Sequence, residues 1–198
     1  LLPFAHAQDV LPIPALTGHV VDNTGTLNPT DKAVLEAKLS ALETAKGSQV
    51  VVLMVPTVQP EDISSYANRV GNAWKIGRKN VGDGVLLIVA KEDRKVRIEV
   101  AKTLEGAIPD MIAASIIDHE ITPNFKEGNY YRGLDEATTA IFKAAAGEYK
   151  APAEYGKGKK KGISLGTIIF IIIVLIIVFS GAGGSGGGGY VSRRGYRG

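Results

Sequence analysis

Four acidic residues at the predicted ends of strands and helices are the side chains in this sequence best suited to chemistry. Asp22 follows an apolar pair, Asp83 stands between two glycines, Glu105 precedes a glycine, and Asp110 follows a proline. Carboxylate oxygens on adaptable loops are the ligands that calcium and magnesium require. The four residues therefore form a candidate divalent-cation site, for which we expect calcium first and magnesium as the other possibility.

A predicted hairpin brings three of these acids together. The run Val85–Ala90 is almost entirely aliphatic, as in a strand covered on both faces, whereas Val96–Val100 alternates apolar and charged residues, as in a half-exposed strand. The short charged link between the two runs predicts an antiparallel hairpin. Because a hairpin brings its outer ends together, Asp83 should lie close to Glu105 and Asp110.

Each acid also has a simpler structural interpretation. Asp83 can be a turn residue, and Asp110 can stabilise the positive end of a helix. Glu105 can be a solvated loop acid, and Asp22 a turn residue. None of the spacings is a recognised metal signature, so the prediction of a shared site depends on all four acids converging at one end of the sheet.

Patterns before the hairpin predict the first half of its scaffold. A helix begins after Asn28, whose side chain caps it, and ends at Gly47. The β-branched run Gln49–Val55 predicts a central strand, and a second helix covers about Glu61–Ile76. A strand, a helix and a strand in this order predict parallel pairing of the first strand with the first strand of the hairpin.

Two more helices are expected after the hairpin. One begins at Pro109 and ends at Pro123, with Glu120 in the middle of its apolar side, and the last covers about Asn129–Ala146. The predicted fold class is α/β: an α/β/α sandwich with a mixed, mostly parallel central sheet. The soluble domain is expected to occupy residues 8–147.

An apolar run predicts one C-terminal transmembrane helix at residues 163–180. No charged residue occurs between Lys161 and Arg193, and about 20 apolar residues are enough to cross a bilayer core. Residues 148–162 have the Lys, Gly and Pro content of a flexible linker, and residues 181–198 form a Gly-rich tail that we expect to be disordered. The protein is therefore expected to contact the membrane through one helix.

The first residues predict export of the domain. Residues 1–7 resemble the end of a signal peptide with an A-x-A cleavage pattern at Ala5–Ala7, although a disordered Pro-rich tail is the alternative. Export predicts a single-pass protein of the bacterial inner membrane, with the domain in the periplasm and the tail in the cytoplasm. The lysines before the predicted span outnumber the arginines after it, which favours the opposite orientation, but a domain of this size is exported largely regardless of such charges.

Composition excludes several kinds of function. The formal net charge is only +3, and the excess basic residues flank the apolar run, so the sequence predicts no nucleic-acid partner. There is no cysteine, which excludes disulfides, thiolate metal sites and a cysteine nucleophile.

A series of short motifs runs in a consistent order through residues 19–145. They are Val21–Leu27, Gln49–Val52, Trp74–Gly77, Gly82–Leu87, Arg97–Glu99, Leu104–Gly106 with Pro109–Asp110, and Thr122–Phe125 leading into Gly128–Tyr130. In this series the chain resembles the TPM-domain family, particularly its YgcG-like bacterial membrane-anchored members. The resemblance implies an α/β/α sandwich in an extracytoplasmic domain on a membrane anchor.

The resemblance implies several activities, because some members of that family are acid phosphatases, several bind calcium or other divalent cations at loop carboxylates, and others are accessory proteins of membrane complexes or receptors. We expect a divalent-cation-binding accessory module of the cell envelope, with another envelope protein as its partner. The alternative is a metal-assisted acid phosphatase, in which the cation polarises a phosphoryl oxygen of a phosphomonoester.

Overall fold

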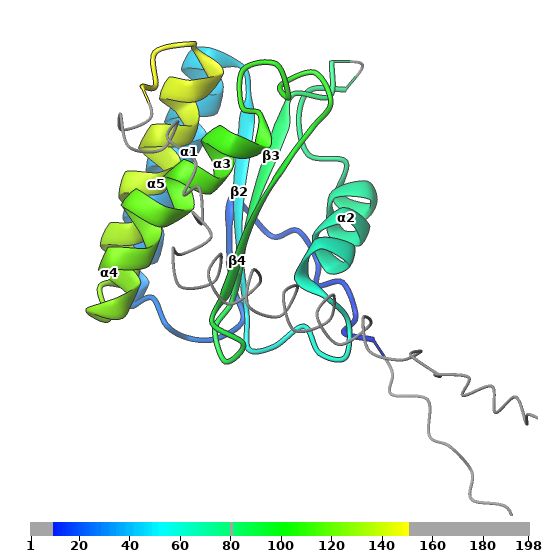
Figure 1. Ribbon diagram of the computed structural model, residues 1–198, viewed down its shortest axis with the longest axis vertical. Helices are drawn as coiled ribbons and strands as arrows, with labels where there is room; N and C mark the ends of the chain where they lie inside the picture. The colour runs from blue at the N-terminus through cyan, green and yellow to red at the C-terminus, as the bar shows by residue number, and fades with distance from the viewer. Residues whose placement is uncertain (1–9, 80, 151–198) are drawn as a thin grey trace, which may run out of the picture. The chain divides into compact units, whose positions relative to one another are not determined.

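The structure, a computed structural model, describes residues 10–79 and 81–150, in which a four-stranded sheet lies between two layers of helices (Figure 1). The strands are β1 (Val20–Asp22), β2 (Gln49–Val55), β3 (Gly84–Ala90) and β4 (Lys95–Val100), in the spatial order β1-β2-β3-β4. The pairs β1–β2 and β2–β3 are parallel, and β3–β4 is antiparallel. The predicted α/β class, mixed sheet and hairpin are confirmed.

The two central strands carry the core on both faces. Every residue of β3 is buried, and β2 is buried from Val50 onward. Alternate side chains point to opposite faces of a strand, so Val85 and Leu87 belong to one core cluster, and Leu86 and Ile88 to the other. The continuous aliphatic runs are therefore explained by helices on both faces.

One face of the sheet is covered by α1 (Pro29–Lys46) and by the helices that follow β4. The Asn28 side chain accepts a 2.8 Å hydrogen bond from the Asp31 amide, and Gly47 ends the helix with φ of 86°. Leu35 and Leu39 are fully buried against this face. The last helix, α5 (Tyr130–Ala145), contributes Leu134 and Ile141 to the same cluster.

The other face is covered by α2 (Ile63–Trp74), on the opposite side of the sheet from α1 and α5 in Figure 1. Residues 10–17, which we call the N-terminal strap, are attached to this helix. The Trp74 Nε1–H donates to the Pro14 carbonyl over 2.8 Å, and Arg69 Nη2 donates to the Leu11 carbonyl over 2.9 Å. The strap thus adds apolar cover to a face on which α2 is the single helix described.

The helix after β4 differs from its prediction. It starts as α3 (Asp110–Ile116), widens into a π-helical turn, η1 (Ile117–Ile121), and continues as α4 (Thr122–Lys126). Pro123, which was expected to end the helix, lies in the first turn of α4. A proline lacks the N–H that an α-helix needs and its ring crowds the preceding turn, so the wider turn ahead of it lets the helix continue.

The π-helical turn also changes where Glu120 lies. The prediction placed this side chain in the middle of an apolar face, but the residue is partly exposed. The extra residue in the turn rotates the positions that follow relative to regular helical spacing. Ile121 is fully buried in its place.

The predicted signal-peptide remnant, transmembrane helix and Gly-rich tail lie outside the described residues, as does the linker beyond residue 150. Within residues 10–79 and 81–150, no helix combines the length and the apolar character that a membrane span needs.

Candidate functional site

Strand register assigns the four predicted acids to two different edges of the sheet. At the amino-end edge, Gly84 pairs with Gln49 and Val85 with Val100, so Asp83 and the loop that follows β4 share this edge. Asp22 pairs with Met54, one residue before the carboxyl end of β2. A seven-residue strand is about 20 Å long, so Asp22 lies at the far edge. The expectation that all four acids converge is therefore not met by Asp22.

The Asp22 carboxylate organises the loop between β1 and α1. One oxygen accepts hydrogen bonds from the Thr24 amide at 2.8 Å and the Thr24 hydroxyl at 2.6 Å, and the other accepts from the Leu27 amide at 2.9 Å. Burial alone would raise the pKa of Asp22, but the hydrogen bonds from Thr24 and Leu27 outweigh burial and hold the pKa below its ordinary value. This geometry matches the turn-residue interpretation.

Asp83 is engaged by a single arginine. The residue is 2% exposed; its Oδ1 accepts from the Arg78 amide at 2.9 Å, and its Oδ2 lies 2.8 Å from Arg78 Nε and 2.7 Å from Nη2. Burial pushes the pKa of Asp83 upward, but the hydrogen bonds and charge of Arg78 outweigh it, so the pKa is lowered. A cation could bind this carboxylate only if Arg78 moved away.

Glu105 and Asp110 line one hollow of about 420 Å³ at the amino-end edge, which we call the acidic hollow. Both residues are exposed, and Asp110 opens α3. Glu99 of β4 is a third acid in its wall, and the Glu99 carboxylate accepts from Arg97 Nε at 3.1 Å. Asp83 is not among the residues that line this hollow.

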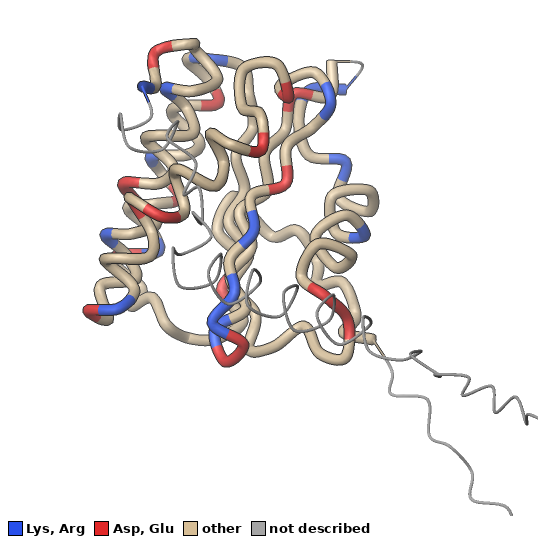
Figure 2. Tube along the Cα trace, in the orientation of Figure 1, with Lys and Arg blue, Asp and Glu red and all other residues tan. Residues whose placement is uncertain are grey.

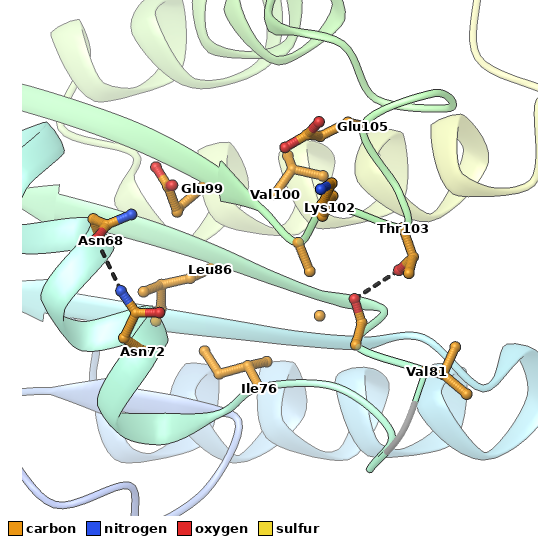
Figure 3. A pocket seen from close by; sticks show the side chains of 14 residues that line it. Asn68, Asn72, Ile76, Val81, Leu86, Glu99, Val100, Lys102, Thr103 and Glu105 are labelled. Atoms are coloured by element: carbon orange, nitrogen blue, oxygen red, sulfur yellow. Dashed lines mark hydrogen bonds between the residues drawn. The ribbon is translucent and has the colours of Figure 1, made fainter.

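The acidic hollow continues into a groove between α2 and β4, because Glu99, Val100 and Glu105 line both. This groove, of about 480 Å³, has Glu99 and Glu105 on its β4 side and Asn68 and Asn72 on its α2 side (Figure 3). The Asn72 amide donates to Asn68 Oδ1 at 2.8 Å. The walls therefore offer oxygen acceptors, amide donors and the cation of Lys102 beside apolar surface from Ile76 and Leu86.

The amino-end edge also contains an ordered loop contact. Thr103 Oγ1 donates to the Gly82 carbonyl over 2.6 Å, which connects the loop after β4 to the turn before β3 (Figure 3). This bond brings the two outer ends of the hairpin together, as the sequence predicts. It does so through a hydroxyl and a backbone carbonyl, and not through the acids themselves.

Among the described residues, no three His, Cys, Asp or Glu side chains are grouped closely enough to hold a metal ion. The acidic hollow thus supplies two exposed carboxylates, with Glu99 already bonded to Arg97. Calcium sites usually use six to eight oxygen ligands. Water or movement of the exposed side chains would have to complete a site here.

The sequence prediction missed the roles of Arg78 and Glu99. Arg78 lies five positions before Asp83, and nothing in that spacing distinguishes a partner from a solvated arginine. Glu99 was detectable, because strand alternation places Glu99 on the same face as Arg97, on the α2 side of β4. Burial confirms this alternation, since Ile98 is the buried residue between them.

The fold and the site define a three-layer α/β domain with a groove of mixed polar and apolar lining at the amino ends of its parallel strands. The TPM domain family matches residues 20–144, which is more than half of the sequence. The chain therefore belongs to the TPM domain family.

Solved structures agree with this assignment. The solution structure of the N-terminal domain of a P. gingivalis protein is 29% identical, covers 66% of this chain and 83% of its own, and superposes with a TM-score of 0.60. BA42 from the psychrophilic bacterium Bizionia argentinensis is 20% identical, and the match covers 65% of this chain and 87% of BA42 with a TM-score of 0.55. The N-terminal domain of cg2496 from Corynebacterium glutamicum is 12% identical, and the match covers 73% of this chain and 92% of that domain with a TM-score of 0.53.

At these lower identities, the last two structures bear on the fold alone. No curated protein matches the chain.

Proposed function

We propose that this TPM-domain protein is a membrane-anchored, extracytoplasmic binding module of the bacterial cell envelope whose acidic hollow holds a divalent cation. The observation that carries the proposal is that Glu105 and Asp110, two of the four acids selected from the sequence, line one solvent-accessible hollow. Their carboxylates are exposed, whereas those of Asp22 and Asp83 are engaged by neighbouring groups. Calcium is the expected ion because its ligand geometry is adaptable, and magnesium is the second candidate.

The groove beside the acidic hollow is the surface on which a partner protein of the envelope would bind. A cation held by Glu105 and Asp110 would neutralise part of the acidic wall and leave open coordination positions towards the groove. An acidic side chain of another envelope protein can fill such positions. The module would then bind that partner in a calcium-dependent way.

A calcium titration of the isotope-labelled full chain, followed by NMR, tests this site. We expect a dissociation constant on the order of 0.1–1 mM, as in extracellular calcium modules, with the largest shifts at Glu105 and Asp110. The double change Glu105→Gln with Asp110→Asn should abolish the shifts. Glu92→Gln, an exposed acid in the turn at the far edge, is the matched control and should bind normally.

Two outcomes would reject the cation site. One is the absence of shifts at Glu105 and Asp110 under 10 mM calcium, a concentration roughly tenfold above the weak end of that range. The other is an unchanged titration in the double variant. Asp83→Asn, compared in parallel, shows whether Asp83 joins the site after Arg78 is displaced.

The same variants address the phosphatase alternative. Hydrolysis of an aryl phosphate by the wild-type chain, lost in the double variant with the fold intact, would make the acidic hollow a catalytic site. Calcium binding without hydrolysis supports the binding module. A carboxylate-held cation can serve either function, so both measurements are needed.

A further inference from the structure

A second hollow of about 510 Å³ opens at the carboxyl-end edge of the sheet, and it shares no lining residue with the acidic hollow. It lies between the β3–β4 turn and the segment where α4 ends and α5 begins. Its size is within the range of small-ligand pockets, about 300–1,000 Å³. We call it the basic pocket, and its lining residues are Val89, Ala90, Lys91, Arg94, Lys95, Val96, Ile121, Thr122, Phe125, Lys126 and Tyr130.

The basic pocket concentrates positive charge. Its lining includes four basic residues, Lys91, Arg94, Lys95 and Lys126, and no acidic residue, although the chain as a whole has 23 basic and 20 acidic residues. Figure 2 shows basic residues in the β3–β4 turn and at the end of α4. No ion pair in the described part of the chain involves any of the four.

The acids nearest in sequence do not line this pocket. Glu92 and Asp93 lie in the same turn, and Glu127 follows the last lysine of the pocket. The Asp93 carboxylate accepts hydrogen bonds from the Val58 amide at 2.9 Å and the Thr57 hydroxyl at 2.8 Å, and these bonds, together with the charge of Lys95, lower the pKa of Asp93. The positive charge of the pocket is therefore only partly balanced by the protein.

Aromatic rings form one wall of the basic pocket. The Phe125 and Tyr130 ring centroids are 4.7 Å apart with planes inclined by 48°. Lys91 Nζ lies over the Tyr130 ring, 5.3 Å from the ring centroid, in a cation–π contact that places this ammonium beside the aromatic wall. Val89 and Ile121 add apolar surface, so the pocket combines an apolar wall with adjacent cations.

We propose that the basic pocket binds a small phosphomonoester that carries a planar ring, the chemical class of nucleoside monophosphates. A phosphomonoester carries about −1.5 to −2 charges at neutral pH and three acceptor oxygens. It can therefore contact several cations at once, whereas a carboxylate has one negative charge and two oxygens. The planar ring stacks on the Phe125–Tyr130 wall. Because the pocket lies at the opposite edge from the acidic hollow, this proposal does not depend on the proposed function.

Isothermal titration of the full chain in a non-ionic detergent with adenosine monophosphate tests the proposal. We expect saturable binding that weakens with salt, because the cations dominate it. Adenosine and inorganic phosphate, which each supply half of the recognition, should bind at least about tenfold more weakly, since each loses one set of contacts. NMR shifts of the Val89 and Ile121 methyl groups locate the ligand.

Variants distinguish binding in the basic pocket from attraction by the overall charge of the protein. Lys91→Gln with Lys126→Gln should weaken binding on the order of tenfold or more, whereas Lys46→Gln, which removes an exposed cation at the end of α1, should leave it unchanged. Tyr130→Ala should reduce the advantage of adenosine monophosphate over inorganic phosphate. Methyl NMR spectra verify that each variant is folded.

Three results would overturn the proposal. The first is no binding of adenosine monophosphate at millimolar concentration, and the second is binding no tighter than that of adenosine. The third is an equal loss of affinity in Lys46→Gln and in the pocket variant, which would show that only overall charge matters. Failure of the calcium titration would leave this result unaffected, because the two sites share no residue.

Discussion

His19 is held between two carboxylates of α1. Its Nδ1 lies 2.9 Å from Glu36 Oε1, and its Nε2 lies 2.5 Å from Glu43 Oε2. Glu36 also accepts the His19 and Val20 amides at 2.7 Å each, which fastens the start of β1 to the helix. Burial alone would lower the pKa of His19, but the hydrogen bonds to Glu43 and Glu36 outweigh burial, and the pKa is raised.

This arrangement predicts a pH-dependent contribution to stability. A raised folded-state pKa means that the contribution is fully present below the unfolded value of 6.5 and is lost as the pH rises through the folded-state pKa. His19→Gln should therefore destabilise the fold by about 1.5–3 kcal/mol at pH 6, typical of hydrogen bonds to charged groups, and by less at pH 9. Urea unfolding at both pH values measures this difference.

A double-variant comparison identifies the source of that effect. In a chain that already carries Glu43→Gln, the change His19→Gln should cost less at pH 6, because one of the two charged partners is gone. A cost that is the same at pH 6 and pH 9 would contradict the prediction.

Side-chain partners explain why residue-scale prediction of the candidate site was incomplete. Asp22 and Asp83 have the residue type and loop position of ligands, but their oxygens accept from Thr24, Leu27 and Arg78. The Thr24 partner of Asp22 follows the local pattern of a turn-forming aspartate, whereas the Arg78 partner of Asp83 depends on how the backbone folds back and has no local signature. Exposed acids such as Glu105 and Asp110 keep their oxygens available, and sequence reasoning could select them but not distinguish them from the other two.

Gly77, just after α2, and Gly84, the first residue of β3, allow the segment after α2 to cross the start of β3. A Cβ on Gly84 would lie 2.2 Å from the Ile76 carbonyl oxygen, and a Cβ on Gly77 would lie 2.5 Å from the Gly84 nitrogen. Gly77 also has φ of 104°. The sequence suggested that glycines beside Asp83 serve to bend a ligand loop, whereas at Gly84 the requirement is the close approach of two backbones.

This crossing predicts a large difference between two glycine substitutions. Gly84→Ala should destabilise the fold by about 1–3 kcal/mol or more, because the neighbouring backbone must move. Gly106→Ala is the matched control in the loop after β4, where a Cβ would meet nothing within 4 Å, and it should change stability by no more than about 0.5 kcal/mol. Urea unfolding compares the two, and equal effects would show that the crossing is not tight.

The elements that could be predicted from the sequence are those with strong local signals. Both ends of α1 were identified because Asn28 caps the helix and Gly47 ends it in a left-handed conformation. Strand β1 was missed because three residues are too few to show a period of two. The continuation of the helix past Pro123 was missed because the π-helical turn that permits it has no sequence rule.

At the scale of the molecule, the two edges of the sheet carry different chemistry. The amino-end edge has exposed carboxylates, and the carboxyl-end edge has the four cations of the basic pocket. The β3–β4 hairpin produces this separation, because its turn lies at the carboxyl-end edge. The antiparallel β4 adds its own end to the amino-end edge.

The described fold ends at residue 150, and its contacts stay within residues 1–156, which predicts that this part folds without residues 157–198. A chain ending at residue 156 should have the same free energy of unfolding in urea as the full chain, within about 0.5 kcal/mol. If residues 163–180 anchor the protein, the short chain should also be released from the membrane fraction while the full chain resists carbonate extraction. A short chain that stays with the membrane would contradict the anchor.

Strand β4 lies at one side of the sheet, where its outer N–H and C=O groups have no strand partner among the described residues. An open side of this kind can recruit strands from other molecules and start fibrillar growth. Here the charged Lys95, Arg97 and Glu99 alternate with apolar residues along the strand, and charged side chains on an edge strand are one of the features that discourage such pairing. The charged strand thus protects the protein from self-association when it is crowded at high local concentration.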